Sequence, residues 1–151
     1  MSTIHISLAA EPILTLGHLV VTNSMLTSLV GSLVIIVTLW LAARSNAFEA
    51  LSEMILNLIE DVTKDRAKAQ RFFPLLMTLF LFILVNNWLG LLPGVGSITV
   101  KAAEGGVPLF RGANADLNTT LALAVISVVM THVYAIKELG LFRHVSKYVS
   151  W

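Results

Sequence analysis

The chain has 151 residues, of which 56% are hydrophobic and 13% are charged, and its mean hydropathy is +0.83. Soluble domains average roughly 45–50% apolar and about 25% charged residues, so this composition excludes a water-covered domain and predicts an integral membrane protein. The net charge of +1 gives no basic stripe for a nucleic-acid partner, and the absence of cysteine excludes disulfides, thiolate nucleophiles and cysteine metal ligands.

The N-terminal segment, residues 1–24, contains no Lys or Arg before the first apolar run. A cleavable signal peptide needs a basic start, so this segment is expected to be retained as a tail.

Residues 25–43 form an uncharged run of 19 residues. At 1.5 Å per residue such a helix reaches about 29 Å, which is enough to cross a hydrocarbon core of about 30 Å. Asn23 or Ser24 is expected to cap it.

Residues 46–70 predict an amphipathic helix, because apolar side chains recur there at intervals of three and four residues. These side chains are Phe48, Leu51, Ile55, Leu58, Ile59 and Val62. Residues 44–71 carry five cations and five anions, so attraction to anionic lipid is not expected to be the main purpose of this helix. We expect it to lie at the membrane interface and to pack against protein; simple adsorption to lipid is the alternative.

Two further uncharged runs, residues 72–92 and 117–136, predict the second and third membrane spans. The loop between them, residues 93–116, contains five glycines and two prolines, which predict a connection with room for a short hairpin. Residues 137–151 form the C-terminal tail. The fold class expected is therefore all-α and integral to the membrane, with three transmembrane helices and one interfacial helix.

The orientation follows from the Lys and Arg residues outside the spans. The N-terminal tail has none, residues 44–71 have five, the glycine-rich loop has two and the C-terminal tail has three. Since cytoplasmic segments carry the excess of Lys and Arg, we predict that the N-terminus lies outside and the C-terminus inside.

The second span contains two adjacent asparagines, Asn86 and Asn87. An unpaired amide in hydrocarbon costs several kcal/mol, so both should face protein or a hydrated cavity. Neighbouring helical residues point about 100° apart, so the two amides cannot share one direction. Two interpretations stay open: the pair joins this helix to a neighbour, or it opens a water-filled entry from the outer face. Polar side chains around Asn118, at the start of the third span, lie toward the same outer side of the membrane as Asn87. This agreement in depth favours a water-filled entry from outside.

Asp116 comes directly before the third span and is expected to be its N-cap, because a carboxylate there satisfies free backbone amides. His132 is the one side chain within the spans that belongs to a residue type titrating near neutral pH; a structural role is expected, and a proton relay is the alternative. For His18 and His144 the sequence indicates no partner. No Ser-His-Asp set, metal-binding motif or carboxylate pair is present, so no catalytic residue, metal or cofactor is expected.

The segments "RFFPLLMTLFLFILVNNWLGLLPGVGSI" and "PLFRGANADLNTTLALAVISVV" closely resemble subunit a of the F-type ATP synthase, the stationary membrane subunit beside the rotating c-ring. The resemblance covers most of the chain. It implies a non-catalytic, proton-translocating subunit in a bacterial inner membrane, with c-ring subunits, peripheral-stalk subunit b and the rest of the complex as partners. The ion-selective carboxylate of that family belongs to the c-ring, so H⁺ and Na⁺ both stay open.

The resemblance also implies site residues. The outer half-channel of the family is lined by polar residues that match Asn87, Asn114 and Asn118 here, with Asp116 close by. Asn86 is then expected to hold the helix in place, together with Gly90, where some relatives carry an acidic residue.

One feature of the family has no match in this chain. Its arginine facing the c-ring lies on a helix after the third span, beyond Trp151, and no Lys, Arg, Asp or Glu lies within an expected span here. The chain is therefore expected to be an N-terminal part of subunit a. Two alternatives stay open: a non-conducting membrane scaffold that recruits partners through the amphipathic helix, and half of a different, dimeric transporter.

Overall fold

The computed structural model describes residues 10–93, 95, 97–102 and 105–149, and these residues are mostly helical. Three described helices are long and apolar enough to cross a membrane: α1 (Asn23–Ala42), α3 (Arg66–Leu91) and α4 (Leu117–Leu139). The other helices are α2 (Asn46–Thr63), α5 (Leu141–Val149) and the short 3-10 turn η1 (Ala113–Ala115). The expectation of three spans is thus confirmed by length and composition.

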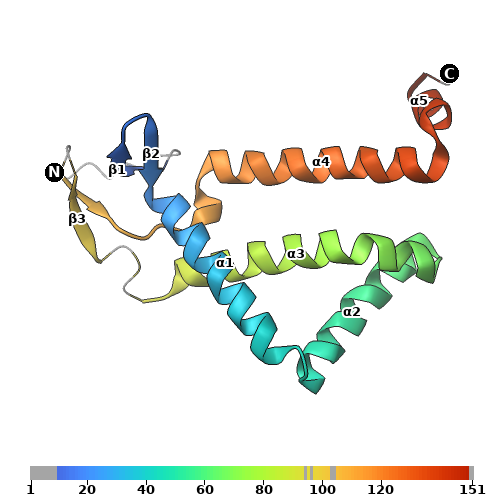
Figure 1. Ribbon diagram of the computed structural model, residues 1–151, viewed down its shortest axis with the longest axis horizontal. Coiled ribbons are helices and arrows are strands. Elements are labelled where there is room, and N and C mark those ends of the chain that lie inside the picture. The colour runs from blue at the N-terminus through green and yellow to red at the C-terminus, as the bar shows by residue number, and fades with distance from the viewer. Residues whose placement is uncertain (1–9, 94, 96, 103–104, 150–151) are drawn as a thin grey trace.

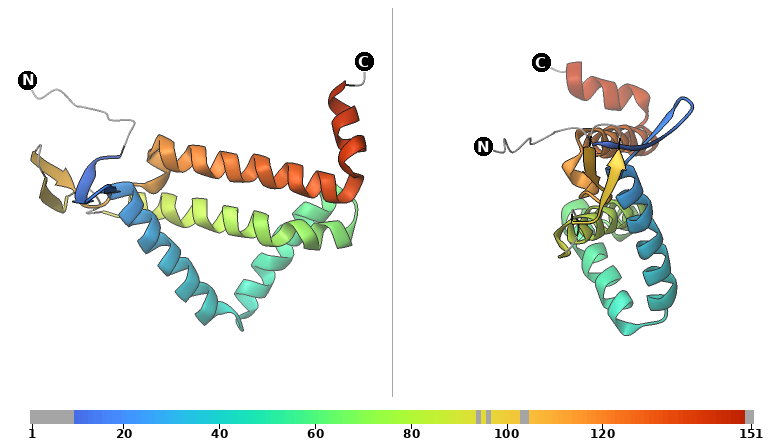
Figure 2. Two further views of the ribbon diagram at one scale, coloured as in Figure 1. Left: turned by 45° about the horizontal axis from the view of Figure 1, so that its top comes forward. Right: turned by 90° about the vertical axis from the view of Figure 1, so that its left-hand side faces the viewer.

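The two longest helices, α3 and α4, run side by side in opposite directions (Figures 1 and 2). α1 crosses α3 obliquely near the C-terminal end of α3, and α2 returns from the end of α1 to the start of α3. η1 lies where α1, α3 and α4 meet. α5 turns away from the end of α4, at the opposite end of the molecule from the hairpins (Figure 1).

The apolar core joins α2 to α3. Its buried members are Ile55 and Ile59 on α2, and Ala69 and Met77 on α3. The three- and four-residue spacing of the apolar side chains therefore serves packing against protein on one side of α2. Other apolar side chains of α2, such as Val62 at 80% exposed, face away from the described protein.

The prediction of one amphipathic helix over residues 46–70 is wrong in its second part. α2 ends at Thr63, because Lys64 adopts a left-handed conformation (φ 54°) and turns the chain. Asp65 then caps α3 by accepting hydrogen bonds from the amides of Ala67 and Lys68. Residues from Arg66 onward thus belong to the second span helix, which begins earlier than the predicted residue 72.

Two antiparallel hairpins accompany the helices, and the sequence leaves room for only one of them. The predicted N-terminal tail contains β1 (Pro12–Leu16) and β2 (Leu19–Thr22), which pair around a turn where Gly17 has a φ of 63°. β3 (Thr99–Ala102) and β4 (Gly105–Pro108) form the short hairpin for which the glycine-rich loop left room. The predicted C-terminal tail begins with the last residues of α4 and continues as α5.

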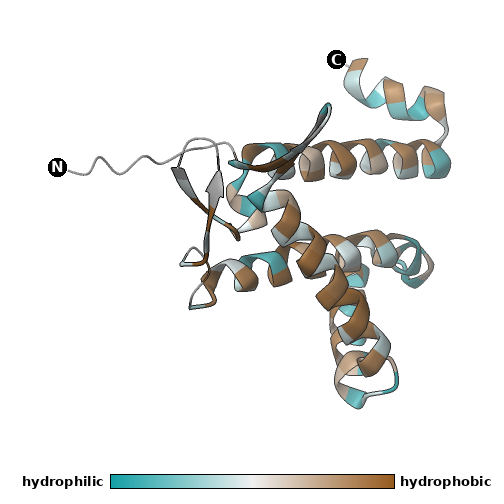
Figure 3. Ribbon diagram, turned by 60° about the vertical axis from the view of Figure 1, so that its left-hand side comes forward, coloured by the Kyte–Doolittle hydropathy of each residue, from teal (hydrophilic) through white to brown (hydrophobic). Residues whose placement is uncertain are grey.

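Apolar residues cover α1, α4 and the middle of α3 on most sides, and polar residues gather at the helix ends (Figure 3). No residue of α4 is buried within the described part of the chain. Such exposure is unfavourable in water and ordinary in lipid or against partner protein.

Candidate functional site

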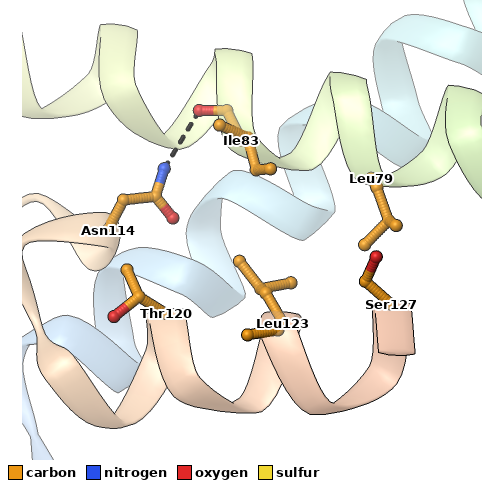
Figure 4. A pocket seen from close by; sticks show the side chains of 7 residues that line it. Leu79, Ile83, Asn114, Thr120, Leu123 and Ser127 are labelled. Carbon is orange, nitrogen blue, oxygen red and sulfur yellow. Dashed lines mark hydrogen bonds between the residues drawn. The ribbon is translucent and has the colours of Figure 1, made fainter. Parts of the chain in front are cut away.

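The candidate site lies where η1 meets the end of α3. Asn114 of η1 donates hydrogen bonds from Nδ2 to Oδ1 of Asn87 (3.1 Å) and to the carbonyl of Ile83 (3.1 Å). Its own Oδ1 is buried and has no hydrogen-bond partner among the described residues. Figure 4 shows the amide of Asn114 between Ile83 on α3 and Thr120 on α4. Two asparagines that the resemblance assigned to one path are therefore in contact.

A cavity of about 340 Å³ lies beside this pair, between α3 and α4. Its polar lining comes from Asn114, Thr120 and Ser127, and its apolar lining includes Leu79 and Leu123. A single water needs only about 10–15 Å³ of such space, so the cavity has room for water, and its few polar groups interrupt a largely apolar lining.

A second cavity, of about 410 Å³, continues the first toward the other end of the helices. Leu79 and Ser127 line both cavities, and Thr131 and Glu138 extend the polar positions along α4. At its far end Arg71 of α3 donates to Glu138 of α4. The space between α3 and α4 is thus a trough with polar groups at intervals and an ion pair at one mouth.

Asp116 lies directly after η1 and is the N-cap of α4, as the sequence predicts. Its carboxylate is 4% exposed and accepts hydrogen bonds from Oγ of Ser24 (2.9 Å), Oγ1 of Thr119 (3.3 Å) and the amides of Asn118 and Ala10 (3.3 Å each). Burial by itself raises the pKa of Asp116, but these hydrogen bonds outweigh it and hold the pKa below its ordinary value. The ionised carboxylate of Asp116 thus joins α1, α4 and the N-terminal segment through its hydrogen bonds.

Asn118 occupies the first turn of α4 and is exposed. Its Nδ2 lies 3.5 Å from Oδ1 of Asp116, at the limit of a hydrogen bond. It is absent from the lining of the cavity that holds Asn114. The structure therefore brings Asn87 and Asn114 together and places Asn118 with Asp116 beside them.

The two adjacent asparagines of α3 point to different neighbours. Asn86 is fully buried, and its Nδ2 donates to the carbonyl of Phe82 on its own helix (2.9 Å). Its side chain fills the space over Gly31 of α1, where an added Cβ would lie 2.6 Å from the Asn86 Oδ1. Asn87 is exposed apart from its contact with Asn114.

Gly90 lies one turn after Asn86 and faces the segment before η1. A Cβ at Gly90 would lie 3.1 Å from the Cα of Gly112, so the glycine lets two backbones approach closely. This contact fixes where η1, and with it Asn114, meets α3.

The sequence missed the importance of three small polar residues at the start of α1. Asn23 is fully buried: its Oδ1 accepts from the amide of Glu11 (3.2 Å), and its Nδ2 donates to the carbonyl of Pro108 (3.3 Å). Oγ1 of Thr27 accepts from the amide of Arg111 (3.1 Å), and Ser24 donates to Asp116. The prediction that Asn23 or Ser24 caps α1 is wrong, because the hydroxyl of Thr22 accepts from the amide of Met25 instead.

His132 has a partner that the sequence did not indicate. Its Nδ1 lies 2.9 Å from Nε2 of His144 on α5, a partner for both histidines that the sequence does not indicate. His18 lies exposed in the turn between β1 and β2. Within the described residues, no group of three or more His, Asp or Glu side chains could hold a metal ion.

Comparison with known proteins decides the family. The sequence matches the family described as "ATP synthase A chain" over residues 24–151. The chain belongs to this family. The match includes α3, α4, all of α1 but its first residue, and every candidate site residue.

Among relatives named ATP synthase subunit a, that of Geobacter sulfurreducens is 31% identical over 93% of this chain and 53% of its own length. The subunit of Geotalea daltonii is 39% identical over 63% of this chain and 34% of its own length, and that of Geotalea uraniireducens is 36% identical over 69% and 38%. The chain thus spans about half the length, or less, of the curated relatives it matches.

Proposed function

We propose that this chain contributes the outer proton-entry half-channel to the membrane sector of an F-type ATP synthase, as a non-catalytic subunit in a bacterial inner membrane. The observation that carries the proposal is the hydrogen bond between Asn87 and Asn114, beside a largely apolar trough between α3 and α4 that Asn114 helps to line. An ion path through a membrane needs polar groups that face protein or water at depth, and the two asparagines are such groups.

We infer that the partners are the c-ring, peripheral-stalk subunit b and the other subunits of the complex. The family relationship supports this assembly. The resemblance puts the arginine that faces the c-ring carboxylate on a later helix, beyond Trp151. Arg71 is paired with Glu138 at the mouth of the trough, so we do not assign the step at the c-ring to Arg71.

The scaffold alternative depends on an amphipathic helix that is free to recruit partners. Its support is weakened because Ile55 and Ile59 on one side of α2 are already buried against α3. The remaining exposed apolar side chains of α2 suit a membrane interface, which is the place we propose for it.

Asn87→Leu tests the proton path in the assembled complex. Leucine removes the acceptor for Asn114 and puts an apolar side chain at the head of the trough. We therefore expect proton flux per assembled complex to fall several-fold, with assembly largely retained. Flux is measured as acid-driven proton uptake into vesicles that contain the reconstituted membrane sector.

Asn86→Leu is the matched control, since it changes the same residue type one position earlier. Because Asn86 is buried against Gly31, this variant should impair assembly more than flux per assembled complex. If Asn87→Leu also fails in assembly and leaves flux per complex normal, Asn87 is a packing residue and the proposed path is wrong.

A further inference from the structure

The pair of His132 and His144 has a specific geometry. Nδ1 of His132 and Nε2 of His144 are 2.9 Å apart, a normal distance for an N–H···N hydrogen bond. The two ring centroids are 5.1 Å apart. That separation is fully accounted for by the N···N distance plus the centroid-to-nitrogen radius of each ring. The two nitrogens therefore point almost directly at each other, as in a linear hydrogen bond, and do not converge on a third point as two metal ligands would.

A linear bond between two imidazoles needs one donor and one acceptor. When both rings are neutral, one nitrogen carries the shared proton and the other accepts it. A first added proton leaves this arrangement intact, because an imidazolium still donates to a neutral imidazole. A second added proton puts N–H groups on both facing nitrogens, so the bond is lost and two positive charges meet. The first protonation of the pair therefore keeps the hydrogen bond, and the second breaks it.

This bond is well placed to decide the position of α5. Among the described residues it is the only side-chain hydrogen bond between α4 and α5. The connection between them is Gly140, whose φ of 79° suits glycine, and most of α5 is exposed, including Phe142 at 91%. His144 itself is only 8% exposed and lies under the ring of Tyr148, with a centroid distance of 5.4 Å.

The surrounding charges give the pair no anion to offset a second proton. The charged groups at the end of α4, on α5 and at the start of α3 are Lys137, Glu138, Arg143, Lys147, Arg66, Lys68 and Arg71, and Arg66 is paired with Glu53 and Glu60 of α2. The carboxylate of Glu138 is engaged by Arg71, and Lys68 lies 3.7 Å from Asp65. Within the described residues, neither imidazole is hydrogen-bonded to a charged side chain. A second positive charge therefore adds to a local excess of cations.

We propose that the His132–His144 pair is a proton-sensitive latch, which holds α5 against α4 while at least one imidazole is neutral and releases α5 when both are protonated. The latch is independent of the proposed proton path, because it lies at the other end of α4 from Asn114. Its effect on stability has a definite sign: docking of α5 is favoured at high pH and lost as the pH falls.

The chain contains no cysteine, so spin labels can be placed without removing native thiols. Labels attached through Val128→Cys on α4 and Val149→Cys on α5, both exposed positions, report the distance between the helices. We expect one distance population at pH 8 in the full chain in phosphatidylcholine nanodiscs. At pH 5 we expect that population to be lost to a broader one.

His144→Gln is the decisive variant. A glutamine amide both donates and accepts, so it can bond to His132 in either protonation state. We expect this variant to keep the pH 8 distance population down to pH 5. His144→Leu should lose that population at every pH, and His18→Gln, at an exposed histidine in the N-terminal hairpin, should respond to pH as the native chain does.

A label pair at Thr38 on α1 and Phe80 on α3 follows the rest of the fold, and its distance should not change between pH 8 and pH 5. The proposal is overturned if the native α4–α5 distance is the same at both pH values or is broad at pH 8. It is equally overturned if His144→Gln keeps the pH response, or if the α1–α3 distance changes together with the α4–α5 distance.

Discussion

At the scale of single residues, two neighbouring asparagines have different surroundings. Asn86 is fully buried over Gly31 of α1, whereas Asn87 is exposed and meets Asn114 of η1. The 100° between successive helical positions makes this division possible. The first residue therefore holds two helices together, and the second is available to the trough between α3 and α4.

The contact between Gly31 and Asn86 predicts the sign of a substitution. Replacing a glycine inside a helix with alanine ordinarily stabilises by about 0.5–1 kcal/mol, because alanine loses less backbone freedom. At Gly31 the new Cβ would lie 2.6 Å from the Asn86 Oδ1, which no close-packed contact allows. We expect Gly31→Ala to destabilise the chain by about 1–3 kcal/mol, measured by thermal unfolding in detergent.

The double variant Gly31→Ala with Asn86→Ala checks the cause of that loss. Because the second change removes the atom that the new methyl group meets, the two effects should not add. A single Gly31→Ala variant that is as stable as the native chain would contradict the tight crossing of α1 and α3.

At the scale of elements, one carboxylate joins three segments that are far apart in the sequence. Asp116 caps α4, accepts from Ser24 on α1 and accepts from the amide of Ala10 before β1. These donors keep its pKa low despite burial of the carboxylate. The junction fixes where α4 begins relative to α1, and so where Asn114 meets α3.

The low pKa of Asp116 predicts how stability depends on pH. An aspartate in the unfolded chain has a pKa of about 3.9, and in the folded chain the pKa of Asp116 is lower. Its contribution is therefore fully present above about pH 4 and is lost as the pH falls through the folded-state value. We expect the native chain to be more stable than Asp116→Asn at pH 7, and the difference to shrink toward pH 3 in thermal unfolding.

Asp61→Asn is the matched control, at an exposed carboxylate on α2. It should change stability by no more than about 0.5 kcal/mol at pH 7. If Asp116→Asn shows an equally small change, the hydrogen bonds to Asp116 do not stabilise the junction.

At the scale of the whole molecule, the described chain is an open arrangement of helices. α1 leads away from α3 and α2 returns to it, α4 touches the rest mainly at its ends, and no residue of α4 is buried (Figure 1). A membrane or other protein must therefore cover much of the apolar surface. This openness agrees with a family whose members are named as subunits of a larger enzyme.

The proposed orientation can be read from the two ends of this arrangement. The hairpins and η1 gather at one end, and the start of α3 and the end of α4 lie at the other (Figure 2). With the N-terminus outside, a cysteine at the exposed Ser97 should react with a membrane-impermeant maleimide on intact cells whose outer membrane has been permeabilised. A cysteine at the exposed Gln70 should react only after the inner membrane is opened. The reverse pattern would invert the topology.

The membrane class, the three spans, the family and the cap at Asp116 could all be predicted from the amino-acid sequence. Each of these depends on composition or on local spacing, which a single segment carries. Tertiary packing was needed to show which asparagine is buried, why Gly90 and Gly112 approach closely, that His132 meets His144, and that Ser24 bonds Asp116. It also revealed that α2 ends at Thr63, because the left-handed Lys64 is held where α2 folds back on α3. These contacts join residues far apart in the chain, and their partners are chosen by helix crossings that no local pattern encodes.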